Sequence, residues 1–173
     1  LLHFDNGIRD EMGNIWEMSS GDYTIDTSKT GYFGTGCADF GLNYLQCTSD
    51  NFIMGTEDFT VEMRMFGNKG GISSLSGGRN HIDQGVSFGS TYSMVGSKYQ
   101  GDYQGFGSIA LADQWNHIAI VRYGARFSFY VNGVLSHYVD RADDYEINSN
   151  MFVINGAYFD TGNPYSYKGY YDE

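Results

Sequence analysis

Apolar and polar side chains alternate over several short stretches of this chain, and a period of two residues is typical of a half-buried β-strand. Residues 59–66 read FTVEMRMF and give the clearest case. Phe59, Val61, Met63 and Met65 share one face, while the other face carries mostly polar side chains. The pattern predicts a strand with one face in the core.

A second set of strands is predicted near the centre of the chain. Residues 115–123 and 126–131 flank Gly124, which suits the positive φ of a tight hairpin turn. The Asn-Gly pair that follows is another turn signal, and residues 134–139 continue as a further strand. Three strands joined by short turns predict an antiparallel meander.

The other strand signals are shorter, and no segment keeps a helical spacing of apolar residues over three turns without a glycine. Turn residues recur about every ten positions. These features predict an all-β fold, a two-sheet antiparallel β-sandwich or jelly roll, with a closed up-and-down barrel as the alternative. The additional predicted strands are residues 1–5, 70–76, 85–89, 151–154 and 170–171.

The composition narrows the class of partner. A length of 173 residues suits a single domain over 1–173. The formal net charge of −11 argues against nucleic acid and anionic membranes, which recruit basic proteins. Neutral sugars, cations and basic proteins remain as possible partners, although an acidic composition alone often serves only solubility.

No apolar run is long enough to span a bilayer. Because the chain lacks an initial Met and ends in a strand pattern, we expect a piece of a larger polypeptide or a chain that stops short.

The two cysteines bracket a segment that resembles a hairpin. Cys37 and Cys47 lie at matching distances from a turn centred near Leu42, and therefore on one face of the predicted hairpin. That placement permits a cross-strand disulfide, which would indicate an oxidising compartment. Two buried free thiols are the alternative, and the sequence leaves both open.

The order of several motifs resembles the laminin-G-like branch of the concanavalin A-like lectin and glucanase superfamily. The resemblance spans nearly the whole chain and implies a jelly-roll sandwich. This fold carries lectins, adhesion modules, glycanases and viral surface proteins, so the resemblance says little about function. The motifs are LHFDNG at 2–7, DFGLNYL at 39–45, DFTVE at 58–62, WNHIAIV at 115–121, FYVNG at 129–133 and GYYDE at 169–173.

The chain departs from the family pattern at three places. Arg64 stands where the family often has an aromatic residue. Residues 76–107 form a longer stretch, richer in Gly and Tyr, than a minimal member has. The last strand is cut short. The first two departures affect the surfaces on which a ligand would bind.

The carboxylates of the central strand do not match the catalytic pattern of related glucanases. Retaining hydrolysis needs two carboxyl groups about 5–5.5 Å apart. Asp58 and Glu62 are four positions apart, roughly 13 Å along a strand, and Thr60 stands where an acid would be needed. No G-x-S-x-G elbow is present, and His117 and His137 lack a partner at zinc spacing. We therefore expect no enzyme activity, and interpret Glu57, Glu62 and the histidines as structural.

The resemblance also implies a structural calcium ion. In this superfamily the first and last strands are often neighbours, and a calcium ion often joins them. Asp5 and Asp172 would then be ligands, with backbone oxygens supplying the rest. The alternative is that Asp5-Asn6-Gly7 forms an ordinary turn.

Tyrosines in the Gly/Ser-rich stretch are the candidate ligand-binding residues. Tyr92, Tyr99 and Tyr103 present flat rings and hydroxyls, which suit the apolar faces and polar rims of sugars. Such loops also suit protein recognition, and the rings would otherwise cap the sandwich or pack against neighbouring subunits.

The function that these features favour is a non-catalytic, extracellular glycan-binding or adhesion module at a cell or virion surface. The alternative is a structural or assembly module of a virion, fibre or surface layer, with neighbouring subunits as partners. A glycoside hydrolase ranks third, since it rests on fold analogy and an incomplete set of acids.

Overall fold

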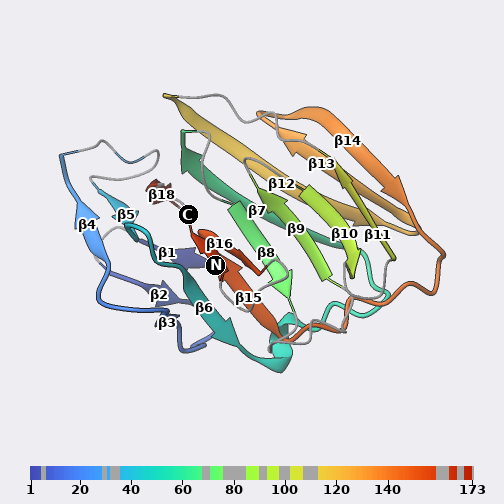
Figure 1. Cartoon of the computed structure of the whole chain (residues 1–173), viewed down its shortest axis with the longest axis horizontal. Helices are drawn as coiled ribbons and strands as arrows, with labels where there is room; N and C mark the ends of the chain where they lie inside the picture. The colour runs from blue at the N-terminus through green and yellow to red at the C-terminus, as the bar shows by residue number, and fades with distance from the viewer. Residues whose placement is uncertain are drawn as a thin grey trace.

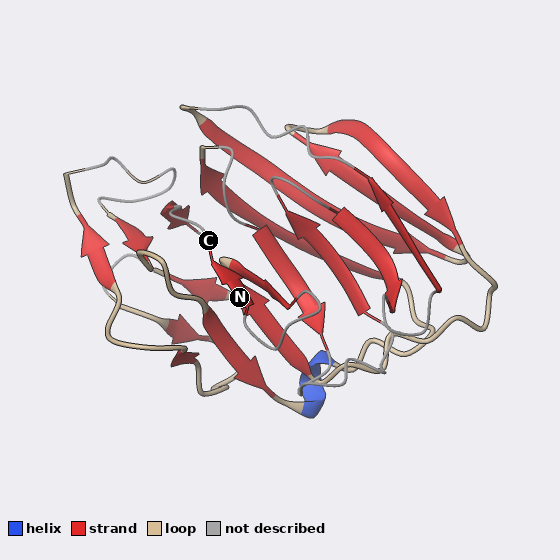
Figure 2. Cartoon of the chain, in the orientation of Figure 1, coloured by secondary structure: helices blue, strands red, loops and turns tan. Residues whose placement is uncertain are grey.

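Two seven-stranded antiparallel sheets make up most of the described part of the protein, as the computed structural model shows (Figures 1 and 2). The structure describes residues 1–4, 7–28, 31, 36–67, 71–75, 85–89, 93–97, 102–106, 113–158, 164–166 and 170–172. This confirms the predicted two-sheet antiparallel sandwich. In the described part of the chain, no helix is both long and apolar enough to cross a membrane.

The first sheet has the strand order β11-β10-β9-β8-β15-β6-β3, and the second has β14-β13-β12-β7-β18-β5-β4. Two short pairs, β1 with β2 and β16 with β17, lie outside them. The elements are β1 Leu2–His3, β2 Arg9–Asp10, β3 Glu17–Met18, β4 Thr24–Asp26, β5 Cys37–Asp39, β6 Leu45–Thr48, the 3-10 helix η1 Asp50–Phe52, β7 Phe59–Phe66, β8 Gly71–Leu75, β9 Gly85–Gly89, β10 Ser93–Ser97, β11 Asp102–Phe106, β12 Trp115–Tyr123, β13 Arg126–Val131, β14 Val134–Asp140, β15 Met151–Ile154, β16 Gly156–Tyr158, β17 Pro164–Ser166 and β18 Tyr170–Asp172.

The central strand and the meander follow the sequence pattern. Strand β7 pairs with β12 and β18, and its Met63 and Met65 are buried between the sheets. Asn132 and Gly133 have φ values of 51° and 77°, as a two-residue hairpin turn with positive φ at both positions requires. The strands β12, β13 and β14 therefore form the predicted meander.

The predicted hairpin between the cysteines is wrong. Strand β5 with Cys37 belongs to the second sheet, whereas β6 with Cys47 belongs to the first, so the segment crosses between layers. Gly41, with φ 59°, lies in the turn that makes this crossing. Both cysteines are buried thiols, and they do not form a disulfide with each other. Burial, followed by the charges of nearby acidic groups, raises the pKa of the Cys47 thiol.

Aromatic rings fill the core where the chain crosses between the layers. Phe40 stacks on Tyr171 with ring centroids 5.3 Å apart, and Phe4 meets Phe40 edge-on at 5.8 Å. The Tyr171 hydroxyl donates to Asn155 Oδ1 at 2.7 Å, so the end of β15 is tied to the last strand. These contacts hold the two sheets in register around the first residues of the chain.

Candidate functional site

The outward face of the meander carries a group of side chains, here called the β12–β14 face, in which Tyr130 is half-buried and the others are exposed: Tyr123, Arg126, Tyr130, Leu135, Tyr138 and Asp140. The strand register sets this grouping, because directly opposed residues point to the same side of a sheet. Tyr123 lies opposite Arg126, which lies opposite Asp140, and Tyr130 lies opposite Leu135. Tyr123 is 79% exposed and Tyr138 is 54% exposed, so two flat rings are open to solvent.

An arginine fixes the position of one of these rings. The Arg126 guanidinium lies 4.2 Å from the centre of the Tyr138 ring. It also donates to both carboxylate oxygens of Asp140, from Nε at 2.7 Å and from a terminal nitrogen at 3.0 Å. The hydrogen bond from Arg126 lowers the pKa of Asp140. The site therefore presents an aromatic ring beside the Arg126–Asp140 ion pair, here called the Arg126–Asp140 fork. The guanidinium supplies hydrogen-bond donors and the carboxylate supplies acceptors, which suits the hydroxyl groups of a polyol.

Small side chains lie between these larger groups. Ala119 and Ser128 point to the same side of the sheet as Tyr130 and Tyr138, their register partners, and both are buried by their neighbours. In the β12–β14 face, aromatic rings therefore lie on either side of a shallow area whose base is formed by short side chains. The hairpin strand β14 is the edge of its sheet, which leaves the face accessible from that side.

The carboxylates of the central strand make structural contacts. Asp58 Oδ1 accepts a hydrogen bond from the Gly124 backbone N–H at 2.7 Å and so caps the β12–β13 turn. Glu62 Oε2 lies 2.9 Å from His117 Nε2, across the pair of strands β7 and β12. These contacts agree with the interpretation of Glu62 and His117 as structural residues.

The predicted calcium ligands are described only in part. Asp172 is fully buried at the end of β18, opposite Arg64 in the register, and Asp5 lies outside the described residues. A Cβ on Gly31 would lie 2.9 Å from Asp172 Oδ2, so a glycine allows the backbone to approach this carboxylate closely. Among the described residues, no group of three acidic, histidine or cysteine side chains forms a metal site. Calcium at Asp5 and Asp172 stays a prediction.

The predicted tyrosine site also stays a prediction. Tyr103 lies in strand β11 rather than in a loop, and its side chain, like Tyr92 and Tyr99, is outside the described part of the structure. Two strands that the sequence patterns did not reveal, β10 and β11, account for part of the long Gly-rich stretch.

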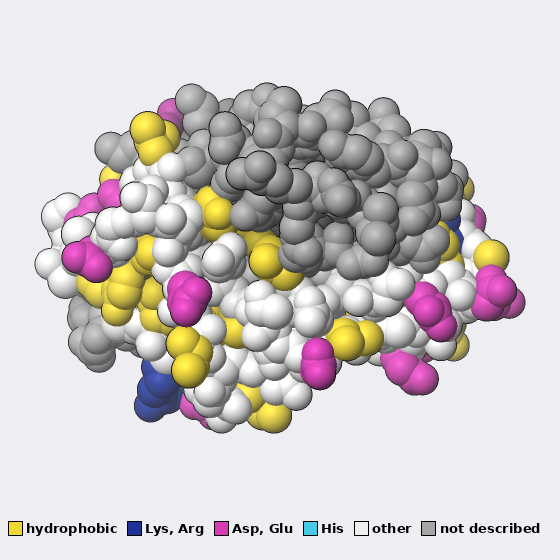
Figure 3. Space-filling view, turned by 60° about the horizontal axis from the view of Figure 1, so that its bottom comes forward, with side chains coloured by type: hydrophobic (Ala, Val, Ile, Leu, Met, Phe, Trp, Pro, Cys, Tyr) yellow, Lys and Arg dark blue, Asp and Glu magenta, His cyan; other side chains and the backbone are white. Residues whose placement is uncertain are grey.

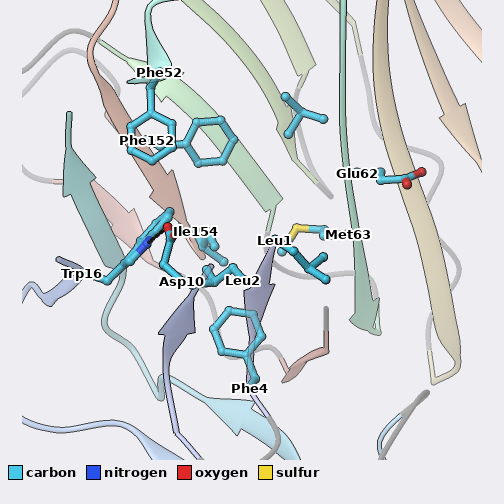
Figure 4. Close-up of a pocket in the computed structure, with 11 residues that line it drawn as sticks. Leu1, Leu2, Phe4, Asp10, Trp16, Phe52, Glu62, Met63, Phe152 and Ile154 are labelled. Carbon is cyan, nitrogen blue, oxygen red and sulfur yellow. Dashed lines mark hydrogen bonds between the residues drawn. The ribbon is translucent and has the colours of Figure 1, made fainter. Parts of the chain in front are cut away.

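Two further features of the molecule are an acidic surface and an apolar cavity. Figure 3 shows acidic side chains scattered over the face in view, with few basic ones among the coloured residues. A cavity of about 190 Å³ lies between β7 and β15, close to the first strand. Its lining is mainly apolar (Figure 4).

The comparison with known families decides the affiliation of the chain. The family model Laminin_G_3, described as the concanavalin A-like lectin/glucanases superfamily, matches residues 41–173. The chain belongs to this superfamily. The predicted resemblance is confirmed, and the two-sheet jelly roll of the superfamily agrees with the topology above. No curated protein is similar enough in sequence to count as a relative.

Solved structures that resemble this superfamily member include several binding domains. Domain 4 of AbnA, an extracellular GH43 arabinanase from Geobacillus stearothermophilus, solved with arabinotriose, has a TM-score of 0.64 at 15% identity, covering 99% of this chain and 92% of that one. The binding domain of botulinum neurotoxin serotype D/C gives 0.63 at 13%, covering 99% and 46%. The binding domain of Paraclostridial Mosquitocidal Protein 1 gives 0.63 at 12%, covering 99% and 48%. The chain thus spans about half of the toxin binding domains, and these likenesses establish its fold.

Sequence reasoning did not single out the β12–β14 face. The sequence does contain a signal for it, because Tyr130 and Tyr138 alternate with apolar residues in two clearly patterned strands. The exposure of Tyr123 follows from its place beside the β12–β13 turn. Which sheet face lacks a covering layer depends on the packing of distant strands, which local patterns do not contain.

Proposed function

We propose that the chain is a non-catalytic glycan-binding or adhesion module that acts outside the cell or on a virion surface. The observation that carries the proposal is the β12–β14 face, where exposed Tyr123 and Tyr138 flank the Arg126–Asp140 fork. An aromatic ring packs on the C–H face of a sugar, while the fork offers donors and acceptors for its hydroxyls.

The charge of the chain supports a neutral glycan. With a formal net charge of −11, a polyanionic glycan would be repelled at long range. The sugar-bound domain of AbnA supports the same class of ligand, since this chain covers nearly the whole of that domain. Tyr92, Tyr99 and Tyr103 remain proposed as further binding residues. Calcium held by Asp5 and Asp172, with backbone oxygens, remains a proposed structural addition.

A panel of immobilised neutral oligosaccharides, with arabinotriose among them, tests this proposal. We expect saturable binding of at least one glycan, and a loss of about tenfold or more in affinity for Tyr138→Ala, equivalent to about 1.4 kcal/mol. Ile15→Ala is the matched control, because Ile15 is 79% exposed and lies outside the β12–β14 face. Absence of binding across the panel would overturn the proposal.

An assembly module is the second candidate, favoured by one observation. The edge strand β14 exposes Val134 (68%) and Leu135 (48%) beside Tyr138, and an open edge with apolar side chains can pair with another chain. Sedimentation of the protein and of Leu135→Glu separates the two functions. Self-association that this substitution abolishes, without any glycan binding, would favour assembly.

A further inference from the structure

The cavity between the sheets lies away from the β12–β14 face and takes no part in the proposed glycan binding. Its volume of about 190 Å³ exceeds the roughly 150 Å³ of an apolar cavity known to admit benzene. Its lining includes Leu1, Trp16, Phe52, Val61, Met63 and Phe152.

One wall of the cavity is a set of aromatic rings that brace one another. Trp16 meets Phe52 edge-on at 5.7 Å and Phe152 at 6.4 Å, and the two phenylalanine rings lie 5.4 Å apart. Figure 4 shows these three side chains on one side of the space and Leu1 and Met63 on the other. Because the rings support each other, the wall keeps its place without filling the space in front of it.

The charged groups of the lining do not favour the binding of water or of an anion in the cavity. Figure 4 shows the Glu62 carboxylate pointing away from the other lining residues. The Asp10 carboxylate already accepts hydrogen bonds from Trp16 Nε1 at 2.8 Å, Asn14 Nδ2 at 3.0 Å and the Met12 N–H at 2.7 Å. A buried water needs two to four polar partners, and this lining offers few. A carboxylate in the wall also repels a ligand that carries negative charge.

The cavity is reachable from solvent. Leu1 contributes to the lining and is 70% exposed, so the space approaches the surface beneath this side chain. Met63 and Ile154, which also line the space, are buried and come from the two different sheets. The space therefore lies between the layers of the sandwich and is partly open to solvent.

We propose that this cavity is a binding site for a small uncharged aromatic group, of one ring or two fused rings. The volume suits a ligand of that size, and the lining offers edges and faces of rings together with the Met63 sulfur, all favourable partners for an aromatic ring. The anionic wall at Asp10 excludes aromatic or aliphatic acids.

The test uses the whole chain with methyl-labelled methionine and follows the Met63 methyl resonance by NMR. Benzene and indole are the probes, and hexanoate is the charged aliphatic control. We expect saturable shifts of Met63 with both aromatic probes, a rise in the melting temperature, and no saturable shift with hexanoate. Absence of saturable shifts up to the solubility limit of the probes would overturn the proposal, as would equal binding of hexanoate.

A substitution that fills the space provides the specificity control. Val61→Phe places a ring in the cavity from strand β7, and we expect it to weaken benzene binding at least tenfold. If the spectrum of this variant shows that it does not fold, Val61→Leu, which adds a single methylene, replaces it and is expected to weaken binding by a smaller factor. Unchanged benzene affinity in the folded variant would place the probe elsewhere and refute the site.

Discussion

Arg122 is the buried charge on which the end of the sandwich depends. It is 1% exposed and points into the core from β12, between its register partners Phe59 and Phe127. Its guanidinium donates hydrogen bonds to the backbone carbonyls of Gly124 and Gly55, both at 3.0 Å. One side chain thereby ties the β12–β13 turn to the loop before β7.

The same guanidinium holds the loop after β14. It donates to the Tyr145 carbonyl at 2.7 Å and, more weakly, to the Asp143 carbonyl at 3.3 Å. Replacing Arg122 by Met removes all these donors, including the one that reaches the Tyr145 carbonyl through a buried hydrogen bond. Three short bonds from a charged donor are worth roughly 4.5 kcal/mol at about 1.5 kcal/mol each. Burial of the methionine side chain offsets about 1.5 kcal/mol of this loss.

We therefore expect Arg122→Met to lower the free energy of unfolding by about 3 kcal/mol, which corresponds to a fall of about 6–12 °C in melting temperature for a domain of this size. Denaturant unfolding followed by circular dichroism measures the first quantity and calorimetry the second. Arg126→Met is the matched control, because its guanidinium pairs with Asp140 at the solvent-exposed surface, where an ion pair contributes little to stability, so this variant should lose far less than Arg122→Met. A loss below about 1 kcal/mol in Arg122→Met would refute the reasoning.

Three further predictions concern acids, thiols and calcium. Burial raises the pKa of Asp10, but the hydrogen bonds that its carboxylate accepts outweigh this effect and lower the pKa below the usual 3.8. The ionised carboxylate therefore stabilises the fold above pH 3.8, and this stabilisation is lost as the pH falls through the pKa of the folded state. Unfolding free energies from pH 2 to 7 should converge for wild type and Asp10→Asn only at the acid end, and a constant difference would contradict this. Cys37 and Cys47 should react with a thiol reagent only after unfolding, whereas rapid labelling of native protein would contradict their burial. If Asp5 and Asp172 bind calcium, calcium should raise the melting temperature of wild type but not of Asp172→Asn, and an unchanged wild type would reject the site.

The elements that the sequence predicted well are those whose pattern is local. The alternation in residues 59–66 and the Asn132-Gly133 turn depend on neighbours in the chain, and both appear in the structure as predicted. The segment between Cys37 and Cys47 failed for the opposite reason. A turn at Gly41 serves equally for a hairpin or for a crossing between sheets, and only the pairing of β5 with β18 and β6 with β15 decides which.

The same limit explains why the sites were harder to predict than the fold. Arg122 occupies an inward position of β12, where a charged residue interrupts the apolar pattern of the strand. Its role becomes clear only from its carbonyl partners, which come from distant loops. Tyr138 was assigned to the correct strand, but its exposure depends on the absence of a covering strand beyond β14 in the described sheet. Both are properties of long-range packing.

Mapping of a bound glycan by NMR tests the central claim most directly. The strongest glycan from the oligosaccharide panel is titrated into isotopically labelled protein while the backbone amide and tyrosine ring signals are followed. Saturable shifts concentrated on β12, β13 and β14, with the rings of Tyr123 and Tyr138 among the most affected, are the predicted result. Shifts confined to other surfaces, or none at millimolar glycan, would contradict the assignment of the β12–β14 face as the binding site.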